Sequence, residues 1–343
     1  MRIALDAMGG DHAPLETVRG AVEAVANLRE INQIYLVGQK ESIVAELAKY
    51  PGATDDRRLK IVHCDENIAM DDSPASAVRR KKNSSINVCV DLIKRGEADA
   101  LVSAGNSGAV ATAAVFGLGR IKGVIRPAIA AVLPTRHRPL LLLDAGANTD
   151  CHEEWLAQFA VMGAAYSEAV LKQHNPVVGL MSIGTEDCKG NELTKRAFPL
   201  LQKLNLNFRG NVEGHDLFIG ETDVVVCDGF VGNVILKTTE SAAHAIGAWM
   251  KMEFMKHWVR VLGAILLKGA LHALKKRMDP EVYGGAPLLG VPGAVIISHG
   301  SASYRAIYFA IIAAAAAART NVSKLIETRI AEMPQPQVPV VQQ

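Results

Sequence analysis

Six short segments rich in Gly, Asp, Asn and Ser carry the residue types of this chain that are best suited to binding and chemistry. They span residues 6–14, 104–109, 144–150, 184–191, 228–233 and 299–301, and each follows an aliphatic run. Glycine allows turns that bring backbone N–H groups close to a ligand, and helix N-termini add partial positive charge. If the aliphatic runs form one parallel sheet, the six segments lie at equivalent strand ends and converge on one crevice for a small anion.

One of these turns has the strongest anion-binding pattern. Ser103, Asn106 and Ser107 supply hydroxyl and amide donors immediately before a predicted helix, and Lys189 adds a positive charge from another turn. The residues expected to bind the anion are Ser103, Gly105, Asn106, Ser107, Gly108 and Thr185.

Each segment also has a purely structural interpretation, because Gly-Asn and Asp-Gly pairs commonly serve turns and helix caps. Asp144 and Asp228 fit that interpretation as caps or loop anchors, and His12 fits a proton donor, an anion ligand or a solvent-facing loop residue equally well. Taken singly, each segment is better explained structurally, whereas all six together favour a shared function.

Several familiar site patterns are missing from the sequence. It contains no G-x-x-x-x-G-K-[ST] loop, no G-x-G-x-x-G after the first strand, no G-x-S-x-G elbow and no C-x-x-C pair. No spacing of His, Cys, Asp and Glu predicts a metal site, and no cofactor is expected. These absences argue against a nucleotide-binding enzyme and against a serine or cysteine nucleophile.

Aliphatic runs that alternate with helical patterns predict an α/β fold with a doubly wound, mostly parallel, Rossmann-like sheet. Strands are expected at 2–6, 34–37, 60–63, 100–103, 129–133, 140–143, 177–183, 224–227 and 295–298. Helices are expected at 15–28, 42–49, 106–116, 153–171 and 192–203, with 307–318 as a buried alanine-rich helix. Residues 1–332 form one large domain in this interpretation, and the proline-containing tail 333–343 is expected to be disordered.

Composition sets the class of protein. Of 343 residues, 49% are hydrophobic but only 5% aromatic, and 37 Lys and Arg balance 35 Asp and Glu to a net charge of +2. That balance gives no support for a nucleic-acid partner. The five cysteines are widely spaced, which favours a reducing cytoplasm. Asp6 and Asp11 stand where a signal peptide would be apolar, and no apolar run is long enough to span a membrane.

Residues 241–278 depart from this balance and predict a protruding, basic, amphipathic helical pair. Tryptophan, methionine and leucine fall at roughly helical spacing, and seven basic residues between 247 and 278 oppose the single acid Glu253. Such a segment suits a membrane interface, an acidic protein partner or a dimer interface. The residues expected on this face are Trp258, Arg260, Leu262, Leu266, Lys268, Lys275, Lys276 and Arg277.

Ordered motifs along nearly the whole chain give it a family resemblance. They are DAMGGDHAP at 6–14, SAGNSGA at 103–109, RPAIAAVLPT at 126–135, DAGANTDC at 144–151, IGTEDCKGNEL at 183–193, GNVEGHDLF at 210–218, CDGFVGNVILK at 227–237, YGGAPLLG at 283–290 and SHGSA at 298–302. On these motifs the chain resembles the PlsX-type phosphate acyltransferase family. Ser107 stands where threonine is common in the family, and it keeps the hydroxyl.

The resemblance implies transfer of a fatty acyl group from acyl-acyl carrier protein to inorganic phosphate, on a fold similar to phosphate acetyltransferases and isocitrate dehydrogenases. It also implies a homodimer without metal or nucleotide and peripheral contact with the cytoplasmic membrane. A membrane-bound glycerol-3-phosphate acyltransferase would receive the product for phospholipid synthesis. The alternatives are transfer from acyl-CoA, a dehydrogenase of related fold (disfavoured by the missing dinucleotide fingerprint) and a non-catalytic membrane scaffold.

Under this resemblance, phosphate is itself the nucleophile, and the enzyme holds a dianion and stabilises an oxyanion. Lys189 and Asn233 are then the candidates for positioning phosphate or stabilising the oxyanion, with His12 as a proton relay. The residues expected to line the same pocket are Asp6, Gly9, Gly10, Asp11, Asp144, Asp228 and Gly229.

Overall fold

An eleven-stranded sheet organises the computed structural model, which describes residues 1–334. The strands are β1 (Arg2–Asp6), β2 (Gln33–Gly38), β3 (Leu59–His63), β4 (Ala100–Ser103), β5 (Ala128–Leu133), β6 (Leu140–Leu143), β7 (Val177–Met181), β8 (Asn207–Val212), β9 (Val224–Val226), β10 (Ala286–Leu289) and β11 (Ala294–Ile297). Their order across the sheet is β3-β2-β1-β4-β11-β10-β5-β6-β9-β7-β8. All nine predicted strands are present, within one or two residues of their predicted bounds.

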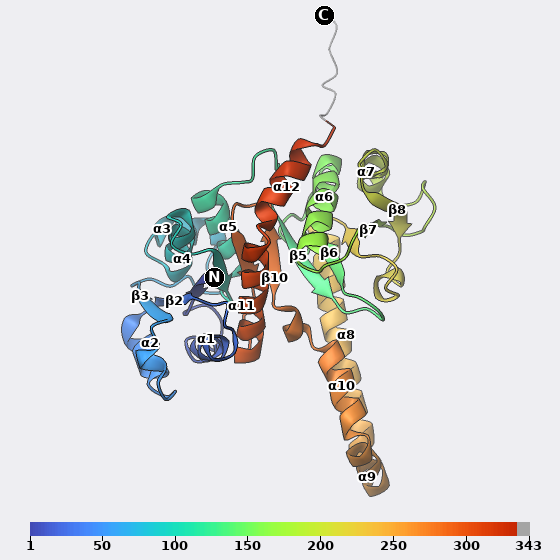
Figure 1. Ribbon diagram of the computed structural model, residues 1–343. Helices are drawn as coiled ribbons and strands as arrows, with labels where there is room; N and C mark the ends of the chain where they lie inside the picture. The colour runs from blue at the N-terminus through green and yellow to red at the C-terminus, as the bar shows by residue number, and fades with distance from the viewer. Residues whose placement is uncertain (335–343) are drawn as a thin grey trace, which may run out of the picture.

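Helices connect most of the strands. They are α1 (Leu15–Asn27), α2 (Lys40–Leu47), α3 (Pro74–Arg80), α4 (Ser85–Lys94), α5 (Ser107–Leu118), α6 (Glu153–Ala169), α7 (Glu192–Gln202), α8 (Gly229–Met255), α9 (Trp258–Leu266), α10 (Lys268–Met278), α11 (Tyr304–Arg319) and α12 (Val322–Ala331). In Figure 1, α11 and α12 lie across the middle of the molecule, between the half that holds β1–β4 and the half that holds β6–β9.

Both faces of the sheet are buried, as the continuous apolar strands predict. Along β1, Ile3 and Leu5 enter one hydrophobic core and Ala4 enters the other. Helices α1, α6 and α11 supply the first core, and α4 and α5 supply the second. The predicted core role of the alanine-rich segment is confirmed, because Ala310 and Ala314 of α11 are fully buried.

The sheet contains two sets of parallel strands that run in opposite directions. Strands β1, β2, β3, β4 and β11 are mutually parallel, and so are β6, β7, β8 and β9. Between the sets, β10 pairs antiparallel with β11 and β5, and β5 pairs antiparallel with β6. The expectation of six equivalent strand ends is therefore wrong: three segments follow one set and three follow the other.

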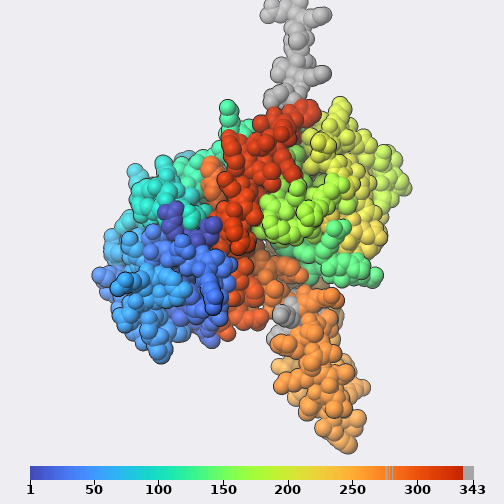
Figure 2. Space-filling view, in the orientation of Figure 1, coloured from blue at the N-terminus to red at the C-terminus, as the bar shows by residue number. Residues whose placement is uncertain are grey.

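The segment 241–278 protrudes as expected, although its helices differ from the prediction. Helix α8 begins at Gly229, within the sheet region, and runs outward to Met255. Figures 1 and 2 show α8, α9 and α10 as a narrow arm that leaves the body, with α9 at its far end. The side chains of Lys275 and Lys276 lie outside the described residues, as do residues 335–343 of the predicted disordered tail.

Among the described residues, no single helix is long and apolar enough to cross a membrane. The bent pair α11 and α12 meets the length and composition criteria together. Its apolar side chains are used in the core, where Ile307, Ile311 and Ile326 are at most 1% exposed.

Candidate functional site

Loops after β1, β4 and β11 meet at one edge of the sheet, which we call the first rim (residues 6–14, 103–108 and 298–301). The Ser103 hydroxyl donates to the buried carboxylate of Asp6 at 2.7 Å and accepts the Gly105 N–H at 3.0 Å. A Cβ on Gly9 would come within 2.7 Å of the Gly105 nitrogen, so only glycine fits where the first two loops cross. The Gly300 carbonyl accepts the Asp11 N–H at 2.7 Å and joins the third loop to the first.

The predicted anion-binding residues therefore divide into two groups. Ser103 is fully buried, and Asn106 is 8% exposed and caps α5 by accepting the Ala109 N–H. Ser107 and Gly108 are exposed in the first turn of α5, where backbone N–H groups have no helical partner. On this geometry Ser103 and Asn106 position the loop, and the start of α5 offers the donors that a ligand can reach.

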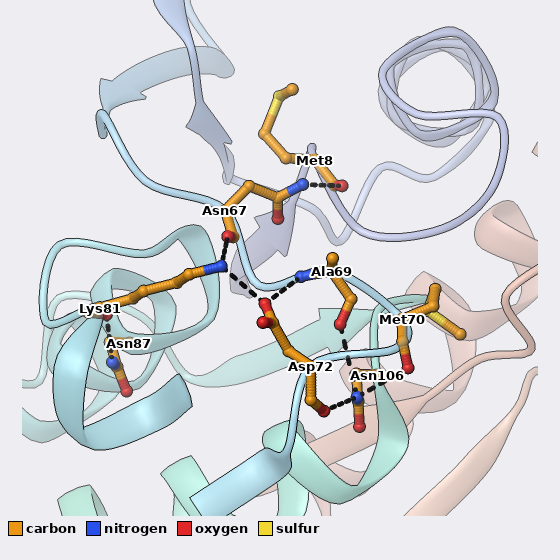
Figure 3. Close-up of polar contacts among 8 residues, drawn as sticks. All are labelled: Met8, Asn67, Ala69, Met70, Asp72, Lys81, Asn87 and Asn106. Carbon is orange, nitrogen blue, oxygen red and sulfur yellow. Dashed lines mark hydrogen bonds and ion pairs between the residues drawn. The ribbon is translucent and has the colours of Figure 1, made fainter. Parts of the chain in front are cut away.

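Asn106 also fastens a strap formed by residues 65–73, which Figure 3 shows. Its amide nitrogen donates to the carbonyl oxygens of Met70 and Asp72, both at 3.0 Å. The Lys81 ammonium donates to the Asp72 carboxylate at 2.6 Å and to the Asn67 carbonyl at 2.8 Å. This hydrogen bond from Lys81 holds the pKa of Asp72 below its ordinary value. The strap thus lies beside the N-terminus of α5, and one amide side chain links the two.

Replacement of Asn106 by alanine is expected to cost about 1–2 kcal/mol of stability, because a helix cap is lost. The strap should loosen as well, since its carbonyl groups lose their donor. The matched control is Asn191→Ala, because Asn191 caps α7 through the Thr194 N–H at 2.9 Å. Thermal unfolding and limited proteolysis should show a larger loss for Asn106→Ala, with new cleavage within 65–73. Equal behaviour of the two variants would mean that Asn106 is a helix cap only.

The buried carboxylate of Asp144 organises a second rim, formed by the loops after β6, β7 and β9 (residues 144–150, 182–191 and 227–233). It accepts hydrogen bonds from the backbone N–H groups of Ile129, Gly146, Ala147 and Asn148 and from the Asn148 amide. Burial raises the pKa of Asp144, and these donors oppose that shift. The role is that of a loop anchor, which is one of the two roles expected for this residue.

Helix α8 starts against the Asp144 loop. Asp228 caps the helix by accepting the Val231 N–H at 2.9 Å. A Cβ on Gly229 would lie 2.6 Å from the Asn148 carbonyl oxygen, and one on Gly232 would overlap the Asp144 carbonyl oxygen. The tight contact leaves Asn233 exposed on the first turns of α8, beside Gly146.

The 184–191 loop completes the second rim from the neighbouring strand β7. The Glu186 carbonyl accepts the Asn211 amide at 2.7 Å, which ties the loop to the end of β8. Thr185 and Lys189 are both exposed, and the stem of Lys189 packs against Gly184. The loop therefore presents a hydroxyl and an ammonium group to solvent, on the rim that also holds Asn233.

One contact that the sequence did not predict joins helix α8 to the first rim. Lys237 of α8 lies 3.3 Å from the imidazole Nε2 of His299, measured from its Nζ. The other ring nitrogen of His299 lies 2.8 Å from the Ser301 hydroxyl. His12, in contrast, is exposed, and its ring makes no hydrogen bond to any residue in 1–334. The available signal was weak: Lys237 ends the motif at 227–237, and His299 stands in the motif at 298–302, 62 positions away in sequence.

Four of the five cysteine thiols are not activated nucleophiles. Burial raises the pKa of Cys151 to about 12 and that of Cys64 to about 11. Burial also raises the pKa of Cys89 and of Cys227. All four are therefore protonated near neutral pH, whereas the thiolate is the reactive form.

The fold has close counterparts among solved structures. It matches a phosphotransacetylase from Streptococcus pyogenes with a TM-score of 0.61, at 19% identity over 93% of this chain and 94% of that one. It matches the EutD phosphotransacetylase from Staphylococcus aureus with a TM-score of 0.59, at 17% identity over 93% and 94%. These likenesses define the architecture as that of the phosphotransacetylases, and at such identities they concern the fold alone.

Sequence comparison defines the family. The profile described as "Fatty acid synthesis protein" matches residues 1–325. A phosphate acyltransferase of Desulfitobacterium hafniense (strain Y51) is 54% identical over 312 residues, 91% of this chain and 92% of that protein. One from Heliobacterium modesticaldum is 50% identical over 330 residues, 96% and 98% of the two chains. The chain therefore belongs to the fatty acid synthesis protein (PlsX) family, and its enzyme class is acyltransferase.

Proposed function

We propose that this protein transfers a fatty acyl group from acyl-acyl carrier protein to inorganic phosphate and so makes acyl-phosphate. The observation that carries the proposal is the contact of Lys237 with His299, which brings helix α8, four residues after Asn233, against the rim that holds the start of α5. Relatives whose sequences are 54% and 50% identical to this chain are named phosphate acyltransferases. This geometry suits a dianion held opposite a thioester carbonyl.

The proposed reaction needs no nucleophile from the protein. A phosphate oxygen attacks the thioester carbonyl, and a thiol leaves readily because its ordinary pKa is about 8.5. The start of α5 at Ser107 and Gly108 binds the dianion, with Thr185 as a further donor from the second rim. Lys189 and Asn233 position phosphate or stabilise the oxyanion, so that the catalytic gain comes from proximity and electrostatics.

Carrier protein is proposed as the acyl donor because the basic face of the arm suits an acidic protein. Arg260, Lys268 and Arg277 are exposed there. The test compares acyl-acyl carrier protein with acyl-CoA at rising salt, which screens exposed charges. Faster transfer from the carrier protein, with a steeper loss at high salt, supports this donor. A preference for acyl-CoA with an equal salt response would assign the alternative donor.

The apolar face of the arm is proposed to serve membrane contact near its far end and homodimer formation along its length. Trp249 is 60% exposed, Trp258 68% and Leu266 87%, and no residue of α9 is buried. Apolar area of this kind binds membrane interfaces or partner subunits. Cytoplasmic location at the membrane surface would hand acyl-phosphate to a membrane-bound glycerol-3-phosphate acyltransferase for phospholipid synthesis.

Leu266→Asp is expected to lower binding to anionic phospholipid vesicles at least about tenfold, because a leucine side chain contributes about 1.5–3 kcal/mol when it leaves water. The matched control is Val44→Asp, which places the same charge on an apolar residue of the body that is 42% exposed. Vesicle sedimentation measures both. Equal sedimentation of the two variants and the parent protein would argue that the far end of the arm does not meet the membrane.

A further inference from the structure

His299 lies in the first rim and contacts helix α8. It comes two residues after β11 ends, and the Ser298 N–H donates to the Ser103 carbonyl at 2.8 Å, which fixes this segment beside the loop that leads into α5. On the opposite side, Lys237 belongs to α8 and is one helical turn after Asn233, so both project from the same side of that helix. The imidazole thus contacts helix α8 about one turn beyond the second rim.

Three polar groups contact the imidazole of His299. Its Nε2 lies 3.3 Å from the Lys237 ammonium nitrogen. Its Nδ1 lies 2.8 Å from the Ser301 hydroxyl and 3.3 Å from the Ser301 backbone nitrogen. Lys237 also pairs with Glu240 at 3.2 Å. The ring is therefore oriented through both of its nitrogens.

We propose that His299 is a catalytic residue that carries the proton of the attacking phosphate to the departing sulfur, while Lys237 turns its ammonium to the phosphate. This inference rests on the proposed function and assigns a group that the family resemblance did not supply. His12 was the expected relay, but its ring lacks any partner in residues 1–334 that would orient it. His299 has such partners on both ring nitrogens.

The proposed step conserves both charge and protons. An electron pair on an oxygen of hydrogen phosphate forms the new C–O bond, and the C–S bond breaks with its electron pair on sulfur. The remaining P–OH proton moves to Nε2 of His299 and from there to the sulfur. The products are acyl-phosphate with two negative charges and a neutral thiol, so charge and protons equal those of the thioester and hydrogen phosphate. Lys237 stays protonated throughout.

The test compares two acyl donors that differ in the acidity of the leaving thiol. A pantetheine thioester releases a thiol of ordinary pKa, about 8.5, whereas a thiophenol thioester releases a more acidic thiol that needs no proton in the transition state. His299→Asn should slow phosphate-dependent thiol release from the pantetheine ester at least about tenfold, because general acid–base catalysis typically contributes about 100-fold or more. Release from the thiophenol ester should fall less than about threefold on the same reasoning.

Ser301→Ala and His174→Asn complete the design. Ser301→Ala removes a partner of the ring without changing the imidazole, and it should show the same selective loss in milder form. His174→Asn changes an exposed imidazole outside both rims and should leave transfer from both donors unaffected. Equal losses for both donors in His299→Asn, no loss with either, or the same selective loss in His174→Asn would overturn the assignment. Absence of release from both donors by the unaltered protein would overturn the proposed function together with this assignment.

Discussion

Lys189→Ala should lower phosphate-dependent turnover at least about tenfold, because removal of one donor to a developing oxyanion typically costs about 100-fold or more. The ammonium is exposed at the second rim, on a loop held by the Asn211 amide, so it can reach a dianion without rearrangement of the fold. Because the side chain is exposed, the variant should unfold at the same temperature as the parent protein. Steady-state kinetics with varied phosphate measures the effect.

The control is Lys195→Ala, which removes another exposed lysine. Lys195 lies in helix α7, six residues further along the chain. A general effect of net charge would lower the rate of both variants alike. Full activity of Lys189→Ala, or equal losses in the two variants, would remove Lys189 from the site. Asn233 lies on the same rim as Lys189, and Asn233→Ala is expected to show a comparable loss of turnover.

Gly232→Ala should be among the most damaging single-methyl changes in the chain. The added Cβ would overlap the Asp144 carbonyl oxygen, which is backbone and cannot rotate away. The start of α8 would have to move from the Asp144 loop, at a cost of about 1–3 kcal/mol or more for overpacking. Both stability and turnover should fall, since Asn233 is the next residue. Thermal unfolding and the thiol-release rate measure the two effects.

Gly247→Ala is the matched control in the same helix. No atom lies within 4 Å of a Cβ at Gly247, which is exposed on the outer part of α8. Alanine favours a helix by about 1 kcal/mol over glycine, so this variant should be slightly more stable and fully active. If Gly232→Ala behaved like Gly247→Ala, the close contact between α8 and the Asp144 loop would not support the site.

Strand identity could be predicted because buried parallel strands are continuous aliphatic runs. Two strands were missed, and each lacks that pattern. In β8, polar residues and Gly210 interrupt the run at an edge of the sheet. In β10, Pro287 cannot donate a ladder hydrogen bond, which argues against a central strand, yet β10 lies between β11 and β5. Because β10 and β5 reverse the direction of the sheet, the two-rim arrangement could not be predicted either.

Helix starts and site contacts were harder to predict than strands. The helix predicted from 241 begins at Gly229, because the cap by Asp228 and the close approach of Gly232 decide its start. The helices α4 and α12 were missed as well. Local sequence identified the Gly-rich turns. It could not show that the Ser103 hydroxyl donates a hydrogen bond to Asp6 or that Lys237 contacts His299. Those contacts join residues 97 and 62 positions apart.

Phosphate-dependent release of free thiol from acyl-acyl carrier protein tests the central claim most directly. The purified protein should release carrier-protein thiol only when inorganic phosphate is present. It should form an equal amount of acyl-phosphate, which hydroxylamine traps as the hydroxamate. Lys189→Ala should reduce both products together. Thiol release that proceeds equally well without phosphate, or no release with phosphate present, would contradict the account.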